Sequence, residues 1–188
     1  MHTLEPFYNW QHLYVASEDE DSMFYGTEYS EFTFTNTIYN YYIHPQWDDM
    51  GSETLYLKIL FVDYDESYAI IELIGEWNDA INNDIMLLKR DIVDDLIFHK
   101  INKFIVIGEN VMNFHASDDS YYEEWFEDVE NGWIVFLNFR EHVLKEFKNA
   151  GLDYFFNTGG ELNDFEWRKF SPGQVFGNVS KIISKRME

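Results

Sequence analysis

Apolar residues are spaced at two different periods along this chain, and the change between them divides the chain into regions. Residues 54–63 and 68–75 are rich in β-branched and aromatic residues and are separated by the polar residues 64–67. Two such segments with a four-residue connection predict a β-hairpin. Residues 28–44 are similarly rich in Tyr, Phe, Thr and Ile, which predicts one long strand or two short ones.

After residue 76 the apolar period changes from two to about 3.6, the period of an amphipathic helix. Nearly continuous apolar runs such as residues 103–108 interrupt this pattern and favour strands that are covered on both faces. The predicted elements are, in order, a helix over residues 79–99, a strand over 103–108, a helix from Ser120, a strand over 133–136, a helix over 139–150, a strand over 153–156 and a helix from Ser171.

Local signals define the ends of three of these helices. Ser120 is followed three residues later by Glu123, and Ser171 is followed by a Gln at the same spacing, so each pair predicts a capping box. Gly132 and Gly151 each follow a helical segment, where a left-handed glycine commonly ends the helix.

A hairpin that leads into alternating helices and strands predicts an α/β fold with a mixed sheet and helices packed on it. Residues 54–157 form the predicted core. Residues 1–53 form an N-terminal extension, in which residues 5–16 have helical spacing and 28–44 supply strands, and residues 158–188 end in a helix. At 188 residues we expect the whole chain to form a single domain.

The charge is strongly negative and unevenly distributed. The chain has 13 basic and 35 acidic residues, for a net charge of −22, and residues 1–75 hold 14 acids and one base, for −13. A field of this sign repels phosphate backbones and anionic lipids, so we expect no nucleic-acid and no membrane partner. Solubility is one explanation of the charge, and an acidic decoy for a basic partner is another.

The chain shows no feature of secretion or of membrane insertion. Its first twenty residues lack the basic start and apolar run of a signal peptide, and no apolar stretch reaches the length of a membrane span. It also has no cysteine, which excludes disulfides, a thiolate nucleophile and cysteine-ligated metals. We therefore expect a cytoplasmic protein.

A polar loop after the strand over residues 103–108 is the main candidate site. It leads into a helix, and ligands of open α/β sheets bind beyond the carboxyl ends of strands. The segment after the neighbouring predicted strand, residues 77–79, is expected beside it. The candidate docking residues are Asn113, His115, Ser117, Asp118, Asp119, Ser120, Trp77, Asn78 and Asp79.

The same loop allows an enzymatic alternative. His115 with a nearby carboxylate such as Asp118 is compatible with a general base, and so with a hydrolase. However, none of the six histidines lies in an H-E-x-x-H pair, and the chain has no glycine-rich phosphate loop and no G-x-S-x-G motif. We therefore predict no cofactor, no metal site and no catalytic residues.

The order of these segments resembles a known family. Leu73-Ile74-Gly75-Glu76, the strand 103–108 with its loop, and the strand 133–136 are together similar to the anti-sigma-factor antagonist (STAS, SpoIIAA-like) domain over residues 55–157. In that family a strand ends in Leu-x-Gly-Glu. A later strand leads into a Phe-x-Asp-Ser-Ser-Gly loop at the start of a helix.

The resemblance implies a docking domain of bacterial signalling that is not an enzyme. In the family the second Ser of the loop is phosphorylated by a partner kinase. Here Phe114 and Ser117 match the motif, whereas Ala116 stands in place of the family Asp, Asp118 in place of the phosphorylated Ser, and Asp119 in place of the Gly. The resemblance therefore implies a docking loop and leaves the phosphorylation switch open.

Together these features predict a regulatory module that docks a protein partner. The sequence does not identify that partner, and it leaves the oligomeric state open, with a homodimer among the options.

Overall fold

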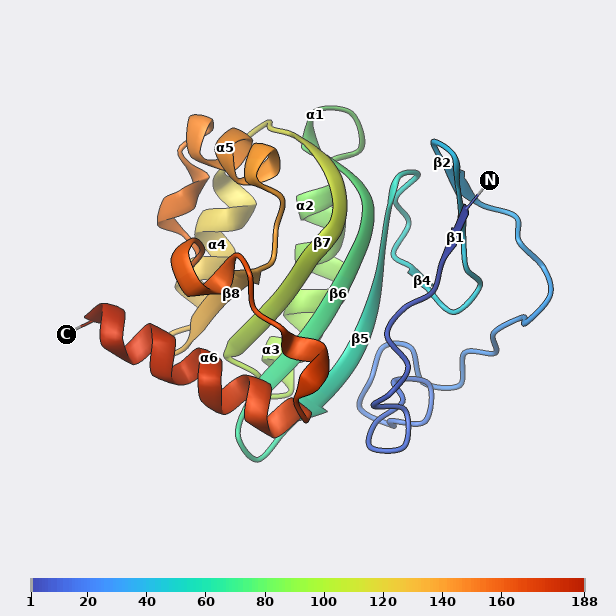
Figure 1. Cartoon of the computed structure of the whole chain (residues 1–188), viewed down its shortest axis with the longest axis horizontal. Helices are drawn as coiled ribbons and strands as arrows, with labels where there is room; N and C mark the ends of the chain where they lie inside the picture. The colour runs from blue at the N-terminus through green and yellow to red at the C-terminus, as the bar shows by residue number, and fades with distance from the viewer. Residues whose placement is uncertain (1, 188) are drawn as a thin grey trace.

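The protein is described here by a computed structural model of residues 2–187, in which helices alternate with the strands of two sheets (Figure 1). The elements in chain order are β1 (His2–Leu4), β2 (Thr37–Ile38), β3 (Tyr41–Ile43), β4 (Asp48–Asp49), β5 (Leu55–Asp63), β6 (Tyr68–Asn78), α1 (Asp79–Asn82), α2 (Asp84–Leu87), the π-helix η1 (Leu88–Val93), α3 (Asp94–Phe98), β7 (Lys103–His115), α4 (Ser120–Asp128), β8 (Trp133–Leu137), α5 (Glu141–Asn149), the 3₁₀-helices η2 (Leu152–Tyr154), η3 (Gly160–Leu162) and η4 (Trp167–Lys169), and α6 (Pro172–Met187).

The larger sheet has the strand order β4-β5-β6-β7-β8. Strands β4, β5 and β6 pair in an antiparallel manner, whereas β6, β7 and β8 are parallel neighbours. The hairpin of β5 and β6 is thus followed by helix–strand units. Helices lie between the parallel strands because two parallel neighbours require a crossover connection. This arrangement confirms the predicted α/β fold with a mixed sheet.

Both faces of the larger sheet are buried, which explains why its strands read as continuous apolar runs. Successive residues of a strand point to opposite faces. Ile71 and Val106 therefore belong to the core on the side of helices α2 to α5, while Ile70 and Ile105 pack with α6 on the other side (Figure 1). No helix within residues 2–187 is long and apolar enough to cross a membrane.

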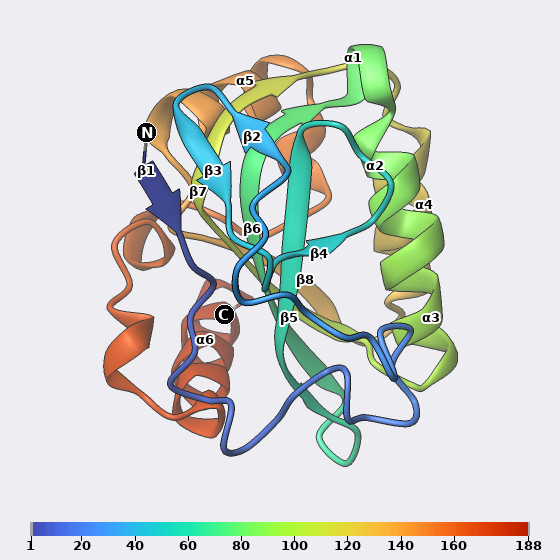
Figure 2. The same ribbon diagram turned by 90° about the vertical axis from the view of Figure 1, so that its right-hand side faces the viewer.

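The N-terminal part of the chain forms the smaller sheet, in the order β1-β3-β2, in front of β5 and β6 (Figure 2). Its buried side chains pack on Tyr56 and Ile74 of those strands. Gly75 permits this close approach, because a Cβ there would lie 2.7 Å from the Ile38 side chain of β2. It would also lie 2.0 Å from the carbonyl oxygen of Thr54, and the φ of Gly75 is 122°.

The helix predicted over residues 5–16 is wrong, since this segment forms successive turns. The apolar spacing reflects tertiary contacts. The Phe7 and Trp10 rings both pack edge-on against Trp167, at 4.8 Å and 5.5 Å between centroids, and the Phe7 backbone N–H donates to the Glu72 carboxylate. These long-range contacts replace helical hydrogen bonding.

The helix predicted over residues 79–99 is interrupted. Asn83 adopts a left-handed conformation with φ 52° between α1 and α2, and residues 88–93 form the π-helix η1. The Asp84 carboxylate accepts from the Asn78 N–H at 2.7 Å, which holds the break in place.

The strand predicted over 103–108 continues to residue 115, because β6 is also longer than predicted and pairs with it.

Helix α4 begins without the capping box predicted at Ser120. Ser120 is already the first helical residue, and the Asp118 carboxylate accepts its N–H at 2.8 Å, so the helix starts one residue earlier. The left-handed residue after α4 is Asn131 rather than Gly132. Gly132 is instead required by close packing, because a Cβ would lie 1.7 Å from the carbonyl oxygen of Asn102.

The strand predicted over residues 153–156 is also wrong. Residues 152–154 form η2, and only Asn157 bridges to β8, at Val135. The aromatic side chains of this segment are used for packing rather than for strand pairing.

The capping box predicted at the start of α6 is confirmed. The Ser171 hydroxyl accepts the Gln174 N–H at 3.3 Å, and the Gln174 side chain accepts the Ser171 N–H at 3.0 Å.

Candidate functional site

The predicted docking residues lie at the carboxyl ends of β6 and β7. In the parallel register Glu76 is opposite Asn113 and Asn78 is opposite His115. The loop over residues 116–119 then connects β7 to α4. The two strand ends that the sequence places beside one another are therefore neighbours.

Residues 115–120 form an uninterrupted exposed stretch. The turn before α4 is held by Asp118, whose side chain accepts the backbone N–H of Ser120 at 2.8 Å. This bonding with Ser120 lowers the pKa of Asp118, because hydrogen bonds to a carboxylate favour its charged form. The loop therefore presents a defined negative charge to solvent.

A polar network joins His115 to the N-terminal sheet. His115 Nε2 lies 2.9 Å from Glu76 Oε1, the Tyr39 hydroxyl donates to the other Glu76 oxygen, and Asn113 Nδ2 donates to the Tyr39 hydroxyl at 3.0 Å. The hydrogen bond to Glu76 raises the pKa of Tyr39. Glu76 and Tyr39 are not among the site residues predicted from the sequence, because no local motif connects positions so far apart.

Residues 77–79 lie beneath this surface rather than on it. Trp77 is fully buried, and Asn78 and Asp79 are 7% and 4% exposed. Asp79 accepts from Tyr122 Oη at 2.6 Å, from Trp77 Nε1 at 2.9 Å and from the Ile85 N–H at 2.8 Å. Burial raises the pKa of Asp79 to about 6. These residues connect β6, α2 and α4 and support the loop from below.

The structure pairs His115 with a carboxylate other than Asp118. The carboxylate that pairs with His115 is Glu76, whereas Asp118 bonds the backbone of its own turn.

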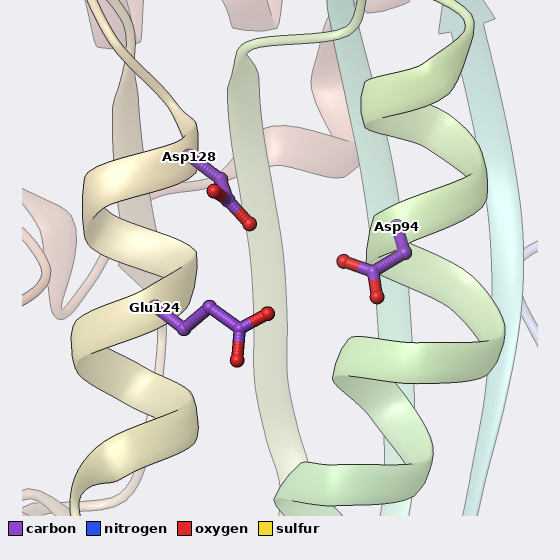
Figure 3. Close-up of side chains that lie close together, drawn as sticks. All are labelled: Asp94, Glu124 and Asp128. Carbon is purple, nitrogen blue, oxygen red and sulfur yellow. The ribbon is translucent and has the colours of Figure 1, made fainter.

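A second group of carboxylates lies between α3 and α4. Asp94, Glu124 and Asp128 face one another across the two helices, with oxygens within 4.8 Å (Figure 3). The Lys89 ammonium bonds all three, at 2.8 Å to Asp128 and 3.4 Å to Glu124, and Arg90 pairs with Glu124 at 2.5 Å. Two side-chain cations thus already pair with these three carboxylates, which leaves one negative charge in excess.

Lys89 is fully buried, and the π-helix places its side chain under α4. Burial alone lowers the pKa of a lysine, but the hydrogen bonds to Asp128 and Asp94 outweigh it here, so the pKa of Lys89 is raised. The cluster therefore connects η1 and α3 to α4 as an ion-pair network. A metal ion at this position would have to displace a charged ammonium group.

Comparison with known proteins gives matches among solved structures only. No family model matches the chain, and no curated protein matches it. A putative anti-sigma factor antagonist from Thermotoga maritima matches with a TM-score of 0.43 at 16% identity, covering 66% of this chain and 92% of its own.

Two structures of SpoIIAA also match. The unphosphorylated anti-sigma factor antagonist has a TM-score of 0.43 at 17% identity, covering 56% of this chain and 89% of its own. The phosphorylated Bacillus cell fate determinant has a TM-score of 0.39 at 17% identity, covering 56% and 92%. These three structures are described as anti-sigma factor antagonists or as SpoIIAA, and the sequence resembles the same class of domain.

Proposed function

We propose that this chain is a regulatory docking module without catalytic activity that binds a protein partner through the loop surface, defined as Tyr39, Asn113 and residues 115–120. The observation that carries the proposal is the exposed run 115–120 at the carboxyl ends of two parallel strands. Rigid scaffolds commonly present binding residues on loops of this kind, because a loop at a strand end leaves polar groups open to a ligand.

The support under the loop favours docking by a preformed surface. Asp79 anchors the first turn of α4 through Tyr122, and it also bonds the N-terminus of α2. The loop between β7 and α4 is therefore attached to buried elements at both ends. A rigid surface loses less conformational entropy on binding than a mobile one, which increases affinity.

The loop surface is also open rather than enclosed. Five cavities of the molecule are lined by other segments. An open polar surface suits a macromolecular partner, whereas small-molecule sites are concave and mostly apolar. Since the net charge of −22 disfavours polyanions, a protein is the partner class that this surface fits.

The test is an affinity purification of the tagged protein from its native cells with quantitative mass spectrometry. Ser117→Lys with Asp118→Lys should remove the partner that the wild type retains. The matched control, Glu146→Lys with Asn149→Lys, changes the net charge by the same amount at exposed positions of α5 and should keep it. Retention of every wild-type partner by the loop variant would contradict the proposal.

A further inference from the structure

A groove lined by aromatic and acidic residues lies at the opposite end of the parallel strands, where β8 begins. It has a volume of about 830 Å³ and is bounded by the end of α4, the segment 153–157 and the end of α6. Three large apolar side chains line it and remain open to solvent: Phe126 is 42% exposed, Tyr154 75% and Met187 77%. Large exposed apolar side chains that lie together are candidates for contact with a binding partner.

The aromatic rings in the groove form one connected cluster. Phe126 lies 5.5 Å from Tyr154 and 6.0 Å from Phe155 between ring centroids, and Tyr154 lies 5.6 Å from Phe155. Because these rings support one another, they form a stable platform rather than separate exposed side chains. Aromatic side chains of this kind are enriched at the centres of protein interfaces.

The charged side chains that line the groove are all negative. Glu127, Glu130 and Asp153 line it and are exposed, and within residues 2–187 none of the three forms an ion pair. Glu124 and Asp128, the neighbours of Glu127 on α4, are by contrast paired with Lys89. The lining contains no Lys, Arg or His. The groove therefore combines an aromatic floor with an unbalanced acidic rim.

This combination restricts what can occupy the groove. A second copy of this chain would bring another net charge of −22 to an acidic surface, and like charges across an interface are costly. A cationic segment, in contrast, neutralises the rim, and its apolar side chains cover the rings. An amphipathic helix with basic and apolar faces meets both requirements.

We infer that the β8 groove, lined by Phe126, Tyr154 and Met187 and bordered by Glu127 and Glu130, binds a cationic amphipathic segment of a partner protein. This site is independent of the loop surface, since it lies at the other end of the sheet and shares no residue with it. It gives the module a second contact point, so that one chain can hold two binding partners or two parts of one partner.

The experiment uses a synthetic amphipathic helix of Lys and Leu with a fluorescent label, titrated with the full chain and monitored by fluorescence anisotropy. The same peptide with Glu in place of Lys is the charge control. The Lys/Leu peptide should bind the wild type, and the Glu/Leu peptide should not. Glu127→Lys with Glu130→Lys should weaken binding at least about tenfold, because two attractive charges become repulsive.

Two matched variants separate the groove from the general charge of the protein. Glu18→Lys with Glu20→Lys alters the net charge by the same amount as the groove variant, at exposed positions that do not line the groove. This control should change the affinity less than about threefold. Phe126→Ala with Tyr154→Ala removes the platform and should also weaken binding at least about tenfold, with folding checked by circular dichroism. Equal binding by groove and control variants, or no binding by the wild type, would overturn the inference.

Discussion

The buried carboxylate of Glu72 should make the stability of this protein depend on pH in a specific direction. Glu72 is 1% exposed at the centre of β6. Its carboxylate accepts the Phe7 N–H at 2.9 Å, and Arg168 lies 3.8 Å away but is closer to Glu109, at 2.5 Å. Burial raises the pKa of Glu72 from 4.5 to about 7, only partly opposed by the Phe7 N–H and Arg168.

The sign of the effect follows from this raised pKa. Between the unfolded value of 4.5 and the folded value of about 7, the folded protein retains a proton that the unfolded chain has lost. The free energy of unfolding therefore falls as the pH rises through this window. At about 1.4 kcal/mol per pKa unit, the total loss from this group is about 3 kcal/mol.

Glu72→Gln should remove this dependence. The amide is neutral at every pH, and its oxygen can still accept the Phe7 N–H. The stability of the variant relative to the wild type should therefore rise by about 2 kcal/mol between about pH 5.5 and about pH 8.5, since part of the titration lies below that range. Starting at about pH 5.5 keeps the protein above its isoelectric point of about 4.4, where solubility is lowest.

The assay is urea denaturation followed by tryptophan fluorescence at a series of pH values. The contribution of Asp79, whose pKa is also raised, is present in both proteins and cancels in the difference. If the wild type and the variant lose stability in parallel as the pH rises, the reasoning is refuted. Such a result would mean that Glu72 is already ionised in the folded protein and stabilised by Arg168.

Three further substitutions test the interior. Tyr122→Phe removes the hydroxyl that donates to Asp79 and should lower the free energy of unfolding by about 1–3 kcal/mol in urea denaturation, whereas an unchanged midpoint would show that the bond contributes nothing. Lys89→Met leaves the carboxylates between α3 and α4 without their buried cation and should cost about 3–5 kcal/mol by the same assay; a stabilised variant would contradict the network. Gly75→Ala places a Cβ 2.0 Å from the Thr54 carbonyl oxygen at a φ of 122°. The substitution should lower the melting temperature by several degrees in calorimetry. An unchanged melting temperature would refute the close approach.

The sequence predicts the sheet well because both of its faces are covered. Runs such as residues 103–108 are apolar at every position, and the structure uses alternate positions for opposite cores. The hairpin of β5 and β6 and the capping box of α6 are encoded by neighbouring residues, and both are confirmed. Local signals hold at these two elements, whereas the equally local capping box predicted at Ser120 does not form, because Asp118 accepts the Ser120 N–H.

The errors arise where tertiary contacts dominate. Residues 5–16 have helical spacing, but Trp10 and Phe7 pack on Trp167, which lies more than 150 residues away in the chain. At the candidate site, the loop and the two strand ends could be predicted from the order of elements. The burial of Trp77 and the contact between Tyr39 and Glu76 could not be predicted from the sequence, because both depend on how distant segments pack.

The central claim, that residues 115–120 contact a protein partner, is tested most directly by site-specific photo-crosslinking in native cells. Benzoylphenylalanine replaces Ser117 in the exposed loop, or Asn149 at the exposed end of α5 as the control. A crosslinked adduct of one defined partner from position 117, and none from position 149, is the expected result. The same adducts at equal yield from both positions, or none from position 117, would contradict the proposed function.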